Sequence, residues 1–103
     1  MLLAFSIAPT AAADDTGSVS QSVARAIRIV RDSGVPHRTD SMFTTLEGDW
    51  DQVMGVVKAC VDELARTSPR VSLVMKADIR PGHTGELDGK LARLERAVRD
   101  QLG

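Results

Sequence analysis

Two extended segments stand back to back in the stretch Val35-Pro-His-Arg-Thr-Asp-Ser-Met-Phe-Thr-Thr-Leu-Glu-Gly-Asp49. The first runs from Val35 to Met42 and the second from Phe43 to Glu47, so together they predict a β-hairpin. No Gly or Asn marks the turn between them, which leaves its position open. Strands joined directly by a hairpin pair antiparallel.

Apolar residues recur at helical spacing before and after the hairpin. The first helix ends at Gly34, and an Asp49–Gln52 capping-box pattern opens the second. The apolar positions are Val19, Val23, Ala26, Ile27 and Val30 in the first helix and Trp50, Val53, Met54, Val57, Val61 and Leu64 in the second. We interpret Trp50 as a core anchor, with a ligand-stacking residue as the alternative. Cys60, the only cysteine, is interpreted as a buried small hydrophobe.

A further strand is predicted at each end of this pattern. Residues 71–80 alternate between apolar and mostly polar side chains, which is typical of a half-buried strand. Near the N-terminus, Leu2–Ala8 is predicted to be a strand stopped by Pro9. The alternative is a short signal peptide ending at Ala13, but no Lys or Arg precedes the apolar stretch, which favours the strand.

A third amphipathic helix follows, with Glu86–Lys90 and Glu95–Arg99 as expected i,i+4 ion pairs. Its apolar stripe consists of Leu87, Leu91, Leu94 and Val98. The element order predicts an α+β fold of ferredoxin-like βαββαβ topology, with a four-stranded antiparallel sheet, two helices on one face and an added C-terminal helix. The length of 103 residues fits a single domain over residues 1–103. The uncovered stripe and the helix-free sheet face predict a homo-oligomer.

Composition argues against several classes of partner. The formal net charge is −1 and only 3% of residues are aromatic, so neither a basic field nor stacking platforms for nucleic acid are expected. No apolar run approaches the roughly 20 residues of a membrane-spanning helix. A single cysteine forms no internal disulfide, which favours a cytoplasmic location.

The sequence contains none of the common catalytic or metal-binding motifs: HExxH, CxxC, GxSxG, GxGxxG and the P-loop are all missing. No enzyme activity, cofactor or metal is therefore expected. Polar side chains do fall on the predicted strands, at Ser6, Thr44, Thr45, Glu47, Lys76, Asp78 and Arg80. They form either a solvated sheet face or a site whose hydroxyls and carboxylates recognise a small polar cation.

Four short motifs, in order along nearly the whole chain, resemble the small thiamine-binding protein (YkoF-like) family, in particular its single-domain members. They are Phe5-Ser-Ile-Ala-Pro9, Ser33-Gly-Val-Pro36, Met42-Phe-Thr-Thr-Leu-Glu-Gly48 and Lys76-Ala-Asp-Ile-Arg80. The resemblance implies a ferredoxin-like fold, dimers or tetramers, and non-catalytic binding of thiamine or its hydroxymethylpyrimidine moiety in vitamin salvage or transport.

The resemblance also implies where the ligand binds. The family's motif residues fall on Thr44, Glu47, Lys76 and Asp78. Phe43 stands where a small residue is commoner and is expected to line the pocket, with Ser6 and Thr45 contributing. The positive charge of thiamine suits a carboxylate such as Glu47.

Two questions stay open at this point. Alternation places Thr44 and Glu47 on opposite faces of a strand, so a bulge or a strand end is needed to bring both to one ligand. The alternative function is an oligomeric regulatory module with a different small-molecule effector.

Overall fold

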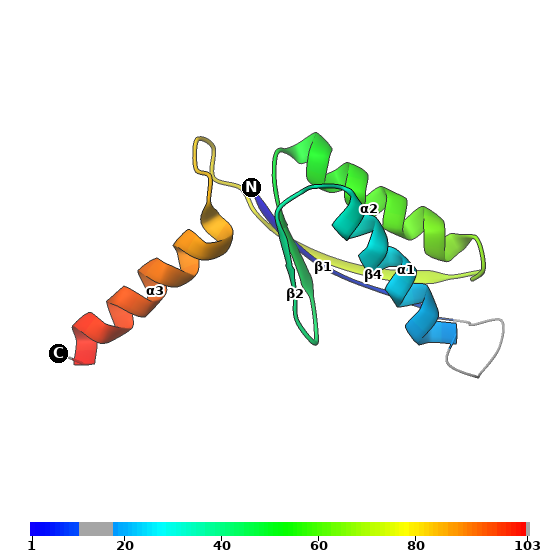
Figure 1. The fold of residues 1–103 in the computed structure, drawn as a ribbon, viewed down its shortest axis with the longest axis horizontal. Helices are drawn as coiled ribbons and strands as arrows, with labels where there is room; N and C mark the ends of the chain where they lie inside the picture. The colour runs from blue at the N-terminus through cyan, green and yellow to red at the C-terminus, as the bar shows by residue number, and fades with distance from the viewer. Residues whose placement is uncertain (11–17, 103) are drawn as a thin grey trace.

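A computed structural model describes residues 1–10 and 18–102 of the protein, and the side chains in these ranges except at 18–20. Four strands and three helices follow one another in the order that the sequence predicts (Figure 1). Their bounds are β1 Leu2–Pro9, α1 Ser18–Asp32, β2 His37–Thr39, β3 Thr44–Glu47, α2 Trp50–Ala65, β4 Val71–Asp78 and α3 Glu86–Leu102. The prediction of an α+β ferredoxin-like fold is confirmed.

The sheet has the strand order β2-β3-β1-β4, with every neighbouring pair antiparallel. The N-terminal strand β1 is thus central, which confirms the strand predicted there. It pairs with β4 along its whole length, from Leu2–Asp78 to Pro9–Val71. Its pairing with β3 is shorter and ends at Phe5–Thr44. Beyond Phe5, therefore, only one edge of β1 has a strand neighbour among the described residues.

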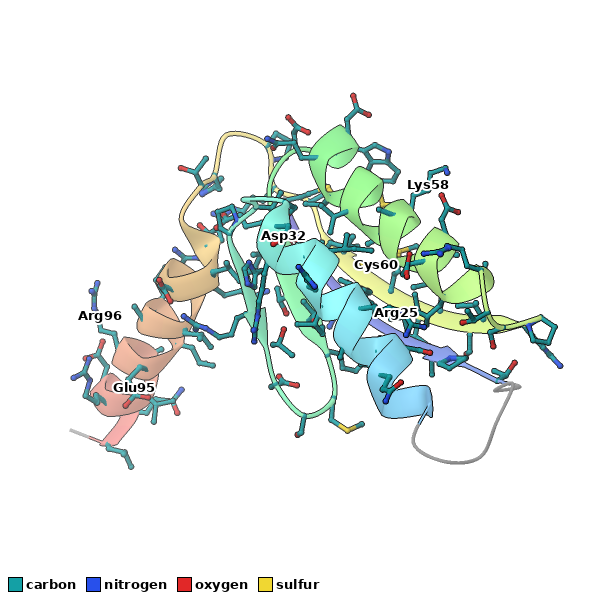
Figure 2. All side chains as sticks on the ribbon, turned by 45° about the vertical axis from the view of Figure 1, so that its right-hand side comes forward. Arg25, Asp32, Lys58, Cys60, Glu95 and Arg96 are labelled. Atoms are coloured by element: carbon teal, nitrogen blue, oxygen red, sulfur yellow. The ribbon has the colours of Figure 1, made fainter. Side chains whose placement is uncertain are left out.

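Helices α1 and α2 lie together on one face of the sheet (Figure 1). Alternation along the strands turns Leu3, Phe5 and Leu46 toward these helices, and each is at most 2% exposed. The helices contribute Ala26, Val30, Val53, Val56, Val57, Cys60 and Leu64 to the same core. The interpretation of Cys60 as a buried hydrophobe is confirmed: Figure 2 shows it on α2 beside α1, its thiol donates to the carbonyl of Ala26 (3.4 Å), and burial raises its pKa to about 11.

The hairpin turn is closed by Asp40. Its backbone N–H donates to the carbonyl of Phe43 (2.9 Å), which leaves Ser41 and Met42 as the loop. Its Oδ1 accepts the backbone N–H groups of Met42 (2.8 Å) and Phe43 (2.9 Å). This side-chain turn takes the place of the Gly or Asn expected in a tight hairpin, and it ends β2 at Thr39, earlier than the extended stretch predicts.

The prediction that Trp50 anchors the core is wrong: its side chain is 56% exposed. The buried stripe of α2 consists of Val53, Val56, Val57, Cys60 and Leu64. Trp50 is the first residue of the helix, one turn before this stripe begins, so it lies at the margin of the helix layer.

Helix α3 projects away from the sheet and the other helices (Figure 1). None of its residues is buried, and the exposed fractions of Leu91, Leu94 and Val98 are 54%, 61% and 43%. Its contacts with the sheet involve β3, and also β2 and β4 through ion pairs of Asp88 and Lys90. No helix among the described residues is long and apolar enough to cross a membrane.

The start of α3 is capped by a distant strand residue. Gly85 occupies the capping position, since its carbonyl accepts the backbone N–H of Gly89 (2.9 Å), but glycine has no side chain to offer. Glu47 of β3 supplies the acceptors: its Oε2 binds the N–H of Glu86 (2.8 Å) and its Oε1 that of Leu87 (3.3 Å). Two otherwise unpaired donors of the first turn are satisfied in this way.

Ion pairs add to this attachment. Arg38 of β2 contacts Asp88 (2.6 Å), and Lys90 contacts Asp78 of β4 (2.7 Å). The predicted Glu86–Lys90 pair is wrong, because Lys90 reaches the sheet and Glu86 pairs instead with Arg93. The expected Glu95–Arg99 pair is not among the ion pairs of the described residues.

Replacing Glu47 with Ala is expected to loosen the start of α3. Removing a helix cap costs about 1 kcal/mol, so amide hydrogen exchange should accelerate at residues 86–89 while the sheet stays protected. Glu95→Ala, an exposed substitution on the same helix, is the matched control and should leave these rates unchanged. Equal exchange at residues 86–89 in Glu47→Ala and the native chain would contradict the capping role.

Candidate functional site

A pocket of about 210 Å³ opens where the hairpin turn, helix α1 and the second half of β1 meet. We call it the hairpin pocket, and its walls come from Phe5, Ser6, Ile7, Val23, Ile27 and residues 39–44. A larger groove, of about 490 Å³, lies between α1 and α2, but it contains none of the site residues that the sequence predicts. The hairpin pocket brings together Ser6, Phe43 and Thr44.

The short pairing between β1 and β3 creates this pocket. Because that pairing ends at Phe5–Thr44, the hairpin turn is not paired with Ser6 and Ile7 of β1. On this side β1 has no strand partner among the described residues, so its backbone groups that point away from β4 face the pocket. A ligand here meets a free strand edge as well as side chains.

The inner walls are apolar. Phe5 and Ile7 rise from alternate positions of β1, and Val23 and Ile27 of α1 are four residues apart and share a helix face. Phe43 at the end of the turn adds an aromatic ring. Such walls favour a flat, weakly polar ring system.

A pair of hydroxyl groups lies in this apolar setting. Thr39 of β2 and Thr44 of β3 are direct partners in the sheet, and their Oγ1 atoms are 3.0 Å apart, within hydrogen-bond distance. Thr44 is only 4% exposed. One hydroxyl donates to the other, so the pair keeps one further donor and several acceptor lone pairs. It can bind a ligand that carries both donors and acceptors.

Asp40 places a negative charge at the rim. Hydrogen bonds from the backbone N–H groups of Phe43 and then Met42 hold the pKa of this carboxyl below its ordinary value of 3.8. The carboxylate therefore stays ionised across the physiological range. Sequence reasoning missed Asp40, although an Asp close to the junction of two extended stretches is a known signal for a turn in which its side chain accepts the backbone N–H two residues on.

The other predicted site residues lie on the opposite, helix-free face of the sheet. Thr45 and Lys76 flank Ala4, and in the next row Glu47 and Asp78 flank Leu2. The strand contains no bulge that brings Thr44 and Glu47 together; alternation separates them. Glu47 is bound to the first turn of α3 and Asp78 to Lys90, and the bond to Lys90 lowers the pKa of Asp78. The predicted residues thus form two groups, not one site.

The described residues contain no cluster of three or more His, Cys, Asp or Glu side chains placed to hold a metal ion. Among the described residues, the lining of the hairpin pocket comprises one carboxylate, four hydroxyl residues and apolar walls. This set suits reversible recognition of a small, partly aromatic cation.

Comparisons with known proteins agree on the family. Residues 3–95 match the model of the family described as thiamine-binding protein. The UPF0045 protein Mb1933 of Mycobacterium bovis is 47% identical over 97 residues, which cover 93% of this chain and 92% of that protein. That relative's name states no activity.

Solved structures share the fold. A domain of unknown function, DUF77, from Bacillus cereus is 32% identical, with a TM-score of 0.73 and 82% of each chain covered. A Thermotoga maritima protein with a proposed role in thiamine biosynthesis or salvage is 24% identical, with a TM-score of 0.69 over 84% of this chain and 91% of that one. At this identity the second likeness shows the fold alone.

Titration of Asp40 is expected to reveal the charge at the pocket rim. Folding lowers the pKa of Asp40. Its carboxylate therefore stabilises the turn fully above pH 3.8, and this stabilisation is lost as the pH falls through the lower pKa of the folded state. NMR signals of the Met42 and Phe43 amides should report this midpoint. The Asp40→Asn variant, which keeps an acceptor oxygen but no titrating group, should abolish the transition. A midpoint at or above 3.8 in the native chain would contradict the assignment.

Proposed function

The chain belongs to the thiamine-binding protein family, as its motifs predict, and from this premise we propose that the hairpin pocket binds thiamine or its hydroxymethylpyrimidine moiety without transforming it. One observation carries the proposal: an apolar pocket, a hydroxyl pair and an ionised carboxylate occur together at the end of the β2–β3 hairpin. Each part has a counterpart in the vitamin.

The size of the pocket suggests which part of the ligand enters it. Sites for whole drug-sized ligands measure about 300–1,000 Å³. A volume of about 210 Å³ is suited to one heteroaromatic ring with its substituents. The aminopyrimidine fits this role, since its amino group donates and its ring nitrogens accept, which matches the Thr39–Thr44 pair and the edge of β1.

The thiazolium ring would then remain at the rim. It carries a permanent positive charge, and Asp40 supplies a carboxylate there that stays ionised at neutral pH. The attraction between them is strongest where the apolar walls exclude water. Hydroxymethylpyrimidine lacks this charge, so thiamine should bind more tightly, and salt should weaken the difference.

The proposed binding site implies a role in handling the vitamin rather than in transforming it. We propose that the protein acts in the cytoplasm, in salvage or transport of the vitamin, as one domain over residues 1–103. Catalysis would require an activated acid or base beside the ligand, and Asp40, the one carboxylate that lines the pocket in the described part of the chain, is held ionised by backbone N–H groups.

A second copy of the chain is the proposed partner of α3. The half-buried Leu87 and the exposed Leu91, Leu94 and Val98 are spaced by four, three and four residues, which is the spacing of a helix seam that packs on a like helix. The exposed Val74 on the helix-free sheet face adds to the surface that needs covering. A homo-dimer or homo-tetramer would cover both the apolar seam of α3 and the helix-free face of the sheet. Thr45 and Lys76 would then lie near the subunit interface rather than at the ligand.

Replacing Thr44 with Val is expected to weaken binding of thiamine and hydroxymethylpyrimidine about 3- to 10-fold, since one hydrogen bond contributes roughly 0.5–1.5 kcal/mol. Thr45→Val is the matched control: it makes the same change one residue away, on the opposite face. Isothermal titration calorimetry on both variants measures the effect, with circular dichroism to confirm that each is folded. Equal affinities in the two variants, or no binding by the native chain at millimolar ligand, would overturn the proposal.

Replacing Leu94 with Glu is expected to reduce the oligomer to a smaller species in light scattering coupled to size exclusion. A charge within an apolar seam is costly to bury. Arg96→Glu changes a residue on the side of α3 turned away from the sheet (Figure 2) and should leave the mass unchanged. A monomeric native chain would contradict the assembly. A stable oligomer whose melting temperature does not respond to thiamine would favour the regulatory module instead.

A further inference from the structure

A second cavity, of about 450 Å³, lies at the other end of β1. It sits beside Met1, between the start of α2 and the loop that joins β4 to α3; Figure 1 shows these segments around the N-terminus. Four strand residues lie between Met1 and Ser6 of the hairpin pocket, a span of about 17 Å from Cα to Cα. The two cavities are therefore separate sites, and this one has the volume of a small-molecule pocket.

One wall of this cavity is apolar and uncovered. Trp50, at the start of α2, is 56% exposed, and Ile79, just after β4, is 58% exposed. Two large apolar side chains that face one cavity without being buried are typical of a ligand surface. The indole ring offers a flat face on which a planar aromatic ring stacks.

The opposite wall carries two basic residues on a rigid turn. The backbone N–H of His83 donates to the carbonyl of Arg80 (3.2 Å), with Pro81 and Gly82 between them. Gly82 has φ +81°, the conformation that a type II turn requires at its third position. Such a turn holds the Cα atoms of Arg80 and His83 within about 7 Å, so both side chains serve one site.

The acidic groups of this region are already engaged. Glu47 binds two backbone N–H groups of α3, and Asp49 accepts the N–H of Gln52 (2.8 Å). Beyond them, Asp78 pairs with Lys90 and Glu86 with Arg93. Glu86 is also 3.8 Å from His83, its one acidic neighbour within ion-pair distance.

Arg80, by contrast, forms no ion pair within the described part of the chain. Its guanidinium lines the cavity and keeps its paired donors for a ligand. A guanidinium binds two phosphate oxygens at once, and a phosphate monoester carries close to two negative charges at neutral pH. The charge of Arg80 also helps to lower the pKa of Asp78 and Glu86, but its donors bond to none of the described residues, and the guanidinium lines the same cavity as Trp50.

We propose that this cavity binds a small planar aromatic molecule that carries a phosphate group, with a mononucleotide as the fitting class. The aromatic ring stacks on Trp50 and packs on Ile79, and the phosphate contacts Arg80 and His83. The site does not depend on the hairpin pocket, and the two prefer ligands of opposite charge.

Trp50 is the only tryptophan of the chain, so its fluorescence reports on this cavity directly. Titration of the full-length protein with AMP should give a saturable change in emission. Adenosine, which lacks the phosphate, and inorganic phosphate, which lacks the ring, should each bind at least about tenfold more weakly. AMP that binds no more tightly than either fragment, or gives no saturable change at millimolar concentration, would overturn the proposal.

Two variants locate the site. Arg80→Ala should weaken AMP binding by about tenfold or more, while Arg96→Ala, which removes an arginine from α3 far from the cavity, should have no effect. Thr44→Val should retain AMP binding, and Arg80→Ala should retain thiamine binding, so failure of one site is distinguishable from failure of the other. Equal AMP affinity in Arg80→Ala and the native chain would place the ligand elsewhere and overturn the proposal.

Discussion

The unequal pairing of the central strand governs the rest of this structure. β1 pairs with β4 over eight positions but with β3 over only four, because the β2–β3 hairpin is short. Where β3 ends, α1 continues above β1, and the resulting gap is the hairpin pocket. A longer hairpin would fill this gap with strand and close the site. The turn at Asp40 sets that length, since its carboxylate takes the two N–H groups that begin the return strand.

Glu47 shows that alternation along a strand gives the residues of one short motif different roles. In the stretch from Thr44 to Glu47, the first residue faces the helices and the last faces the open side. A short motif therefore contributes to two places at once: Thr44 to the pocket and Glu47 to the start of α3. The cap compensates for Gly85, which permits the chain to turn into α3 but offers no acceptor side chain. Glu47 thus has a structural role that sequence similarity alone does not distinguish from ligand contact.

Local patterns predicted most of the fold, because strand alternation and helical spacing are written into neighbouring residues. The strand and helix order, the N-terminal strand and the burial of Cys60 all follow from such patterns. The prediction that Trp50 is buried was wrong because a stripe of apolar residues on a helix does not reveal where the sheet beneath the helix ends. The predicted Glu86–Lys90 ion pair was wrong because Lys90 binds Asp78, a residue of a strand that the helical pattern does not place nearby. The site was predicted only in part, because the pocket depends on register between strands, which short motifs do not encode.

The charge preference of each cavity follows from which side chains the backbone already occupies. At the hairpin pocket, Asp40 is fixed as an anion by two N–H groups, and no basic residue of the described ranges 1–10 and 18–102 lines the pocket. At the other end of β1, the backbone N–H groups of α2 and α3 engage Asp49 and Glu47 instead, which leaves Arg80 and His83 to face the second cavity. Both cavities carry acidic residues in their walls, yet one favours a cation and the other an anion. Counting charges along the sequence would miss this difference: Glu47 and Asp49 are carboxylates that direct oxygen lone pairs to backbone N–H groups at the helix starts, whereas the guanidinium of Arg80 keeps its donors for a ligand.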